Sequence, residues 1–404
     1  MLPLLVSAAE LPFIGQWMAV GDSITHGTYS YSYRWYLQKN FIDAGVSFDA
    51  VGCRSGCYTP AYNTAEYRGR SFDNEHSAQF NIWADEISGQ RYRRRQSVEG
   101  MKSQNFANWL GLSRTLTPNA KGERGSYEGA VRQAAADAAG YAAKRPQPTQ
   151  LVFMSVTCTG AGNPLAERIA SHNAWLRDTL VPSLQEQGKL KVRYADINAG
   201  LQDVTRAPGM GVPSLYAPDR LHPNNQAALL VAGNLGRSLG LPGRTLGLPR
   251  RALSPAVKGV SAKLKKGKTW QQDWKVSDRY TVDMTLSLGN GDKDGWDTEH
   301  ALVISMGNGS RSGTLKVDEA YIRWGDAVLC SRDMSAPSRL RVVWLGTEGD
   351  VPPGFYVWLD GMLIGEALPA EESSLCAVRI RSANEAVKLS LSLAPAEAFA
   401  PGEK

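Results

Sequence analysis

The stretch that decides the fold is Trp17-Met-Ala-Val-Gly-Asp-Ser-Ile-Thr-His-Gly27. Its first four residues are apolar and predict a short buried strand, which breaks at Gly21 before a helix begins. Ser23 therefore lies in a strand-to-helix turn at the carboxyl end of the strand, where an α/β sheet binds ligands. In such a turn the hydroxyl is exposed, and backbone N–H groups can bind a developing oxyanion. The alternative is a serine that only caps the helix.

A second stretch, Ala217-Pro-Asp-Arg-Leu-His-Pro-Asn224, sets an aspartate three positions before a histidine. A nucleophilic serine needs a base, and the base needs a group that fixes its tautomer and stabilises the imidazolium. Asp219 and His222 can supply both. A His-Pro pair in a loop is usually a solvated turn, but the chain has only five histidines and this one lies near a carboxylate.

At these two places the sequence resembles the SGNH, or GDSL-type, hydrolases. Gly21-Asp-Ser-Ile24 matches the first block of the family, and Asp219-Arg-Leu-His222 matches its Asp-x-x-His block. The resemblance covers roughly residues 12–245. It implies a three-layer α/β/α domain with a flavodoxin-like parallel sheet. It also implies a carboxylic ester hydrolase that acts through Ser23, His222 and Asp219, with no metal or organic cofactor.

The second block of the family is altered in this chain. In the family, Glu-Gly-x-x-Gly opens a helix, and its second glycine donates a backbone N–H to the oxyanion. Val98-Glu-Gly-Met-Lys-Ser103 is the best match, with Ser103 in the place of the glycine and Phe106 in the helical run that follows. The first N–H groups of a helix have no internal partner, so that of Ser103 can still donate. His76 to Asn81 is a weaker placement because it lacks the Glu-Gly pair, and a surface turn is the alternative to both.

The third block departs further. Gln150-Leu-Val-Phe-Met-Ser-Val-Thr-Cys-Thr-Gly160 predicts a buried strand that runs into a turn, where the family would end with Gly-x-Asn-Asp. Thr159 stands where the oxyanion asparagine should be, and its hydroxyl can donate one hydrogen bond. Losing one such donor typically costs about 10²- to 10³-fold in rate.

The second half of the chain has a different pattern. Strand and helix patterns alternate from residue 17 to 240, which independently predicts a doubly wound sheet. A Gly- and Pro-rich linker follows, and helical periodicity then disappears. Tyr280 to Leu288 alternates apolar and polar residues, and many such short strands predict an antiparallel β-sandwich. The stretch Tyr356-Val-Trp-Leu-Asp-Gly-Met-Leu-Ile-Gly365 resembles the late hairpin of laminin-G or concanavalin-like modules.

These patterns divide the chain into five parts. We expect a signal-peptide remnant over residues 1–10, the SGNH hydrolase domain over 11–245, a linker over 246–262, the β-sandwich over 263–396 and a tail over 397–404. The first residues are apolar and then small, which favours export to the periplasm, the cell surface or the medium. No later run is long and apolar enough to span a bilayer.

Composition narrows the function further. The formal charge of +6 is modest for 404 residues, and no dense basic face with interleaved aromatic residues indicates nucleic acid. The cluster Arg91-Tyr-Arg-Arg-Arg95 predicts a solvated loop or a contact with an acidic glycan or sulfate. The five cysteines match no zinc pattern. Six of the eleven tryptophans lie in the second half, where they serve core packing or a sugar-stacking platform.

We therefore expect an exported serine esterase that removes O-acetyl groups from a carbohydrate, with a second domain that can hold the glycan. A glycan-binding protein on a catalytically decayed SGNH scaffold is the alternative, to which the altered blocks point. A structural module of the cell surface is a third possibility.

Overall fold

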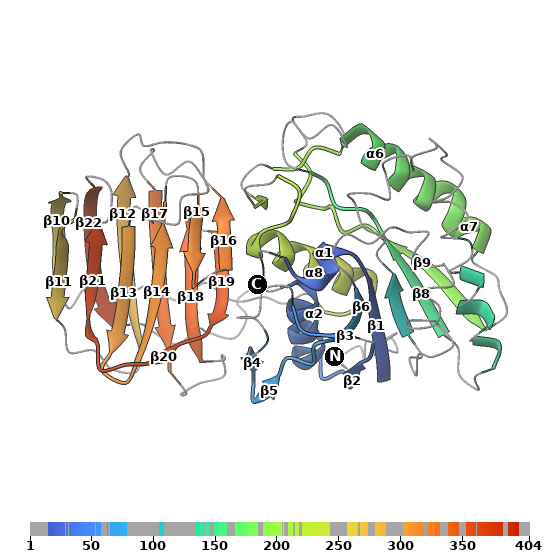
Figure 1. Ribbon diagram of the computed structural model, residues 1–404, viewed down its shortest axis with the longest axis horizontal. Coiled ribbons are helices and arrows are strands. Elements are labelled where there is room, and N and C mark those ends of the chain that lie inside the picture. The colour runs from blue at the N-terminus through green and yellow to red at the C-terminus, as the bar shows by residue number, and fades with distance from the viewer. Residues whose placement is uncertain are drawn as a thin grey trace, which may run out of the picture.

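The computed structural model contains two groups of β-sheets, which lie beside one another in Figure 1. We refer to residues 15–242 as the N-terminal region and to residues 257–395 as the C-terminal region. The structure describes residues 15–28, 30, 32–52, 54–57, 63, 65–78, 105–108, 132, 135–136, 138–140, 142–144, 149–159, 166–184, 189–203, 205, 209–212, 215–217, 220–242, 257–265, 267–273, 279–287, 302–318, 321–325, 327–331, 338–346, 353–360, 362–382 and 387–395.

The N-terminal region is built around a parallel sheet. Its strands are β1 (Gly15–Gly21), β2 (Phe48–Ala50), β6 (Glu75–Ala78), β7 (Asn105–Asn108), β8 (Thr149–Met154) and β9 (Leu190–Ala195), and the short β3 (Arg54–Ser55) is antiparallel to β6. Both β2 and β6 pair with the same side of β1, and β7, β8 and β9 follow on the other side. If β2 and β6 are counted as one interrupted strand, the order is 2-1-3-4-5, which is the flavodoxin-like order.

The helices of this region are α1 (Ser23–His26), α2 (Ser32–Asp43), α6 (Ala166–Trp175), the π-helical η3 (Leu176–Leu180), α7 (Val181–Leu184) and α8 (Asn225–Ser238). Side chains of β1 alternate between two apolar clusters. Trp17 and Ala19 belong to a cluster with residues of α2 and α8, whereas Met18 and Val20 belong to one with residues of η3 and α7. Burial on both faces explains why residues 17–20 of β1 and 151–154 of β8 are continuous apolar runs rather than alternating ones.

One element of this sheet was predicted wrongly. The run after Ser103 was expected to be helical, but Asn105–Asn108 forms β7, the strand between β1 and β8. A strand of four residues has too little length to show a period. Pairing on both edges satisfies its backbone groups, so tertiary context overrides the local pattern.

The C-terminal region contains two antiparallel sheets. One has the order β10 (Val257–Leu264), β22 (Val387–Pro395), β12 (Arg279–Ser287), β17 (Ser338–Leu345), β18 (Gly354–Leu359) and β19 (Met362–Leu368). The other has the order β11 (Thr269–Asp273), β21 (Cys376–Ser382), β13 (Leu302–Asn308), β14 (Arg311–Val317), β15 (Tyr321–Trp324) and β16 (Ala327–Ser331), with β20 (Glu371–Glu372) paired to β14.

Side chains of the two antiparallel sheets contact one another. The ring centroids of Trp324 on β15 and Phe355 on β18 are 4.8 Å apart. A Cβ atom at Gly313 on β14 would lie 2.1 Å from Trp324 and 2.7 Å from Phe355, so only glycine fits there. Trp324, Trp344 and Trp358 are buried, which assigns these three tryptophans to packing rather than to an exposed sugar platform.

The C-terminal strands begin earlier than the predicted end of the linker at residue 262. Strand β10 begins at Val257, inside the stretch 246–262 that was expected to be a linker. The pairing of β10 with β22 shifts in register between Val257 and Val260. This irregularity interrupts the alternation of apolar and polar residues, which is why the start of the strand was missed.

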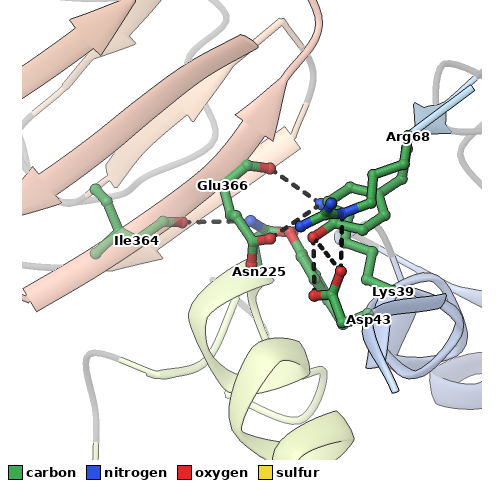
Figure 2. Close-up of polar contacts among 8 residues, drawn as sticks. Lys39, Asp43, Arg68, Asn225, Ile364 and Glu366 are labelled. Carbon is green, nitrogen blue, oxygen red and sulfur yellow. Dashed lines mark hydrogen bonds and ion pairs between the residues drawn. The ribbon is translucent and has the colours of Figure 1, made fainter. Parts of the chain in front are cut away.

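The two regions are joined by packing as well as by the chain. Helix α8 contacts β16 and β19, and residues of both regions belong to one apolar cluster. Figure 2 shows the polar contacts at this junction, where Lys39 of α2 meets Glu366 of β19. A hairpin of β4 (Glu66–Tyr67) and β5 (Arg70–Ser71) lies near the same junction in Figure 1.

Candidate active site

Ser23 lies in the turn that follows β1. Strand β1 ends at Gly21, and α1 begins at Ser23 and ends after one turn at Gly27, whose φ of 91° is a left-handed conformation that suits glycine. Asp22 is the cap of α1, because its Oδ1 accepts a hydrogen bond from the Ile24 N–H at 3.0 Å. The alternative interpretation of Ser23 as the helix cap is therefore wrong, and its hydroxyl is left for another partner.

That partner is His222. The distance between His222 Nε2 and Ser23 Oγ is 2.7 Å, although the two residues are 199 positions apart. Both are largely buried, with 5% of Ser23 and 6% of His222 exposed. This is hydrogen-bond distance for a hydroxyl and an imidazole, and it is the geometry that a base needs to take the proton of a nucleophile.

Backbone hydrogen bonds hold the loop that carries His222. The Ala217 N–H donates to the His222 carbonyl at 2.8 Å, and the Asn224 N–H donates to the Leu215 carbonyl at 2.9 Å. Asn224 also caps α8, since its side chain accepts from the Ala227 N–H at 3.2 Å. The imidazole is thus presented from a tight loop that is anchored on both sides.

Two predicted site residues, Asp219 and Ser103, lie outside the described residues. Ser103 was expected at the start of a helix, and the strand assignment of Asn105–Asn108 removes that reason for choosing it. The weaker placement, His76 to Asn81, begins in β6. Ala78 at the end of β6 pairs with Gly21, so this block leaves the sheet beside the turn that carries Ser23.

Thr159, the remaining oxyanion candidate, follows β8 and is fully buried. Its N–H donates to the Gly209 carbonyl at 3.1 Å, and its carbonyl accepts from the Gly211 N–H at 2.6 Å. Within the part of the chain that the structure describes, its Oγ1 has no hydrogen-bond partner. Leaving a buried hydroxyl unsatisfied costs about 1–3 kcal/mol, so such a group needs an explanation.

Two asparagines that the sequence analysis did not single out hold the segment between β8 and Thr159. Asn173 accepts from the Val156 N–H at 2.7 Å and donates to its carbonyl at 2.8 Å. Asn198 accepts from the Cys158 N–H at 2.9 Å and also donates to the Val156 carbonyl at 2.8 Å. These amides act on the backbone and therefore position the segment that ends at Thr159.

Arg34 was also missed, and it ties the turn after Ser23 to the loops around it. It is fully buried, and its Nε donates to the Thr25 carbonyl at 2.8 Å, while its terminal nitrogens donate to the carbonyls of Gly56 and Asn74. The sequence contains no pattern that predicts a buried arginine of this kind, because its acceptors are backbone carbonyls of three separate segments.

Two further histidines lie behind the turn. The ring centroids of His26 and His76 are 5.0 Å apart. Burial, reinforced by the nearby Arg34 charge, lowers the pKa of His26 to about 4 and that of His76 to about 2. His76 is held as the neutral ring, because Nε2 lies 2.8 Å from the Gly56 carbonyl and Nδ1 accepts from the Ala78 N–H at 2.9 Å. It is thus a structural residue beside the site.

Among the described residues no group of three or more His, Cys, Asp and Glu side chains could hold a metal ion. Cys57, Cys158, Cys330 and Cys376 form no disulfide bond. None of the helices within the described ranges is long and apolar enough to cross a membrane.

No protein-family model matches the chain, and no curated protein matches its sequence. The structure is similar to a carbohydrate esterase of family 3 from Talaromyces cellulolyticus, with 19% identity, a TM-score of 0.43, and coverage of 56% of this chain and 96% of that one. It is similar to the acetyl-xylooligosaccharide esterase Axe2 from Geobacillus, with 12% identity, a TM-score of 0.39, and coverage of 57% and 96%. A protein from Desulfitobacterium hafniense assigned to the lipolytic G-D-S-L family has 10% identity, a TM-score of 0.36, and coverage of 55% and 98%. In its two sequence blocks, Gly21–Ile24 and Asp219–His222, the chain resembles SGNH, or GDSL-type, hydrolases.

Proposed function

We propose that this protein is a serine esterase that hydrolyses O-acetyl esters of a carbohydrate. The observation that carries the proposal is the 2.7 Å distance between Ser23 Oγ and His222 Nε2 at the carboxyl end of the central strand β1. Two residues far apart in sequence meet there in the arrangement that nucleophilic catalysis requires.

The mechanism follows from this pair. Ser23 Oγ attacks the carbonyl carbon of the ester while His222 Nε2 takes the hydroxyl proton. The tetrahedral intermediate collapses, the C–O bond to the alcohol breaks, and His222 gives its proton to the leaving oxygen. Water then repeats the sequence on the acyl-serine and releases the acid. Asp219 is the proposed partner of His222 Nδ1, which would fix the tautomer whose Nε2 accepts a proton.

The developing oxyanion needs hydrogen-bond donors. The Ser23 N–H is one, and the Thr159 hydroxyl, which follows β8 and whose Oγ1 has no hydrogen-bond partner among the described residues, is the second. For the remaining donor we favour the backbone that follows Ala78 over Ser103, because Ala78 pairs with Gly21 directly before the nucleophile turn.

We also propose two domains around the site, export of the protein and a carbohydrate substrate. The two apolar clusters on either side of β1 support a three-layer α/β/α hydrolase domain, and the contacts between the antiparallel sheets support a laminin-G or concanavalin-like β-sandwich. The apolar and then small residues 1–10 support export. A carbohydrate substrate fits the appended sandwich, which would help to hold a glycan near the site.

The test is hydrolysis of 4-nitrophenyl acetate by the wild type, Ser23→Ala and His222→Ala, with Ser183→Ala on α7 as a matched control. We expect wild-type and control rates to agree and the other two to fall by at least about 10³-fold, since triad members act as a unit. Acetate release from acetylated xylan and other acetylated glycans then identifies the substrate. A folded wild type that is as inert as Ser23→Ala, yet is retained on a glycan column, would favour the decayed scaffold instead.

A further inference from the structure

A cleft of about 480 Å³ lies where the N-terminal and C-terminal regions meet. One wall is the β4–β5 hairpin, including Arg68 and Gly69, and the other is made by the start of β14, with Ser310 and Arg311, and by the end of β19. Ligand sites typically have volumes of about 300–1,000 Å³ and occur preferentially between domains. The cleft therefore has the size and the place of a binding site, and the proposed ester chemistry does not use it.

The walls of the cleft are held in position from behind. Lys39 Nζ lies 3.8 Å from Glu366 Oε1 and donates to the Glu366 carbonyl at 3.2 Å, and both side chains are fully buried. The Tyr67 hydroxyl donates to both carboxylate oxygens of Asp43 at 2.9 Å, and Arg68 Nε lies 3.0 Å from Asp43 Oδ1. Figure 2 shows that two side chains of α2 make these contacts: Lys39 contacts Glu366 of one wall, and Asp43 contacts Arg68 of the other. A site built in this way is preorganised, which lowers the entropic cost of binding.

The backbone of both walls contains an unfavourable conformation. Arg68 has φ of 50° and Ala367 has φ of 47°, and they are two of only five non-glycine residues with positive φ in the described part of the chain. The turn Arg68-Gly69 has positive φ at both central positions, where Asn, Asp or Gly is the usual first residue. Such residues persist where the surroundings over-determine them, and they cluster at ligand sites. The contacts of Tyr67 and Arg68 with Asp43 hold the turn in this conformation, which keeps Arg68 at the mouth of the cleft.

The cleft carries two partly exposed guanidinium groups, one on each wall, and the exposed carboxylate of Glu66 lies beside them on β4. The Arg68 side chain is 47% exposed and the Arg311 side chain is 48% exposed. Arg311 Nη2 lies 3.9 Å from Glu372 Oε1, and that carboxylate is 88% exposed, so the pair is loose. A guanidinium has five N–H donors, which leaves both arginines able to bind a second anion as a bidentate fork.

The other lining groups fit sugar hydroxyls. Asn308, Ser310 and Glu66 supply amide, hydroxyl and carboxylate groups at the rim. Trp344 also lines the cleft, where its buried side chain serves packing. The hydroxyl groups of a sugar would accept from the amide and hydroxyl donors at the rim and donate to the carboxylate.

We infer that this cleft binds a saccharide unit that carries a negative charge, either the carboxylate of a uronic acid or a sulfate ester. The anion lies between Arg68 and Arg311, and the ring hydroxyls meet the polar rim. The inference rests on the proposed function for the expectation that the substrate is a glycan, and it narrows that glycan to an acidic one held at a place separate from Ser23.

The test is isothermal titration of the full-length protein with three probes: trigalacturonate, a sulfated carrageenan oligosaccharide of similar length, and a neutral galactan trisaccharide. We expect one acidic probe to bind at least tenfold more tightly than the neutral one, and which of the two binds identifies carboxylate or sulfate. Arg311→Gln should weaken that binding at least tenfold. Arg341→Gln, whose guanidinium is paired with Asp283 on the C-terminal sheet, is the matched control and should leave it unchanged.

Hydrolysis of 4-nitrophenyl acetate is measured in parallel, because it depends on Ser23 and not on the cleft. Equal affinity for acidic and neutral probes, or acidic binding that Arg311→Gln does not change, would overturn the inference whatever the esterase rate. An inert enzyme whose acidic-probe binding is lost in Arg311→Gln would instead retain the cleft and end the proposed function.

Discussion

The junction between the two regions depends on a buried ion pair whose removal has a large and specific expected effect. Lys39 and Glu366 are fully buried and 3.8 Å apart. Lys39 Nζ also lies 5.0 Å from the ring centroids of Trp35 and Tyr36 and 5.1 Å from that of Tyr67. The lysine thus has two kinds of electrostatic partner, the Glu366 carboxylate and the three aromatic rings.

Removing either charge leaves the other uncompensated in the interior, which typically costs about 3–5 kcal/mol. In Glu366→Leu the ammonium keeps the three rings, and cation–π attraction is worth about 2 kcal/mol when desolvated. We therefore expect a loss near 3 kcal/mol for Glu366→Leu and near 5 kcal/mol for Lys39→Met. The double variant Lys39→Met/Glu366→Leu should recover most of this loss, because an apolar pair of similar volume is often as stable as the ion pair.

The assay is urea denaturation followed by circular dichroism, since urea does not screen charge. Arg341→Met is the control, because its pair with Asp283 is partly exposed and its loss should cost about 1 kcal/mol or less. Single-variant losses below about 1 kcal/mol, or a double variant whose loss equals the sum of the two, would refute the reasoning that the pair is desolvated.

Three further outcomes are expected. Asn225 lies three residues after His222, and Asn225→Ala removes its hydrogen bonds with the Tyr36 hydroxyl and the Ile364 carbonyl. Because this loosens the support of His222, kcat for an aryl acetate should fall several-fold while KM stays unchanged. A rise in KM as large as the fall in kcat would contradict this. Burial lowers the pKa of His76 from 6.5 to about 2 in the folded protein, so below pH 6.5 the unfolded chain binds a proton that the folded protein does not. The contribution of His76 to stability is therefore full above pH 6.5, and the free energy of unfolding should fall by about 1.4 kcal/mol per pH unit below it. Urea denaturation between pH 4 and 7 should show a weaker dependence of this free energy on pH in His76→Gln. Thr159→Val should lower kcat by about 10²-fold without loss of stability, and Thr159→Asn should hold or raise kcat in a protein that still folds; a fully active valine variant would exclude the hydroxyl from catalysis.

Much of the fold could be predicted because its signals are local. The apolar run Trp17–Val20 and the break at Gly21 predict a strand and a turn from neighbouring residues alone, and β1 and α1 confirm them. The alternation in Tyr280–Leu288 likewise predicted β12, and Asp360 takes the positive φ that its hairpin turn demands. Strand β7 was missed because four residues carry no period, and β10 because a register shift hides its alternation.

The reacting residues of the candidate site could be predicted from their residue types, but the residues that position them through distant contacts could not. Ser23 and His222 follow from motifs that can be read in the sequence. Arg34, Asn173 and Asn198 could not be found in this way, because each acts through hydrogen bonds to backbone groups of other segments. Such partners become neighbours only after the sheet has formed.

The sequence by itself determined which residues can do chemistry and which local turns present them, because side-chain type, period and turn preference act over a few residues. The tertiary structure alone decided that Ser23 Oγ meets His222 Nε2 at 2.7 Å, that Ala78 pairs beside Gly21, and that Arg68 and Arg311 line one cleft. Each of these contacts joins segments that only strand order and the packing of two regions bring together. No local rule specifies them, because the free energy that favours them is spread over the whole core.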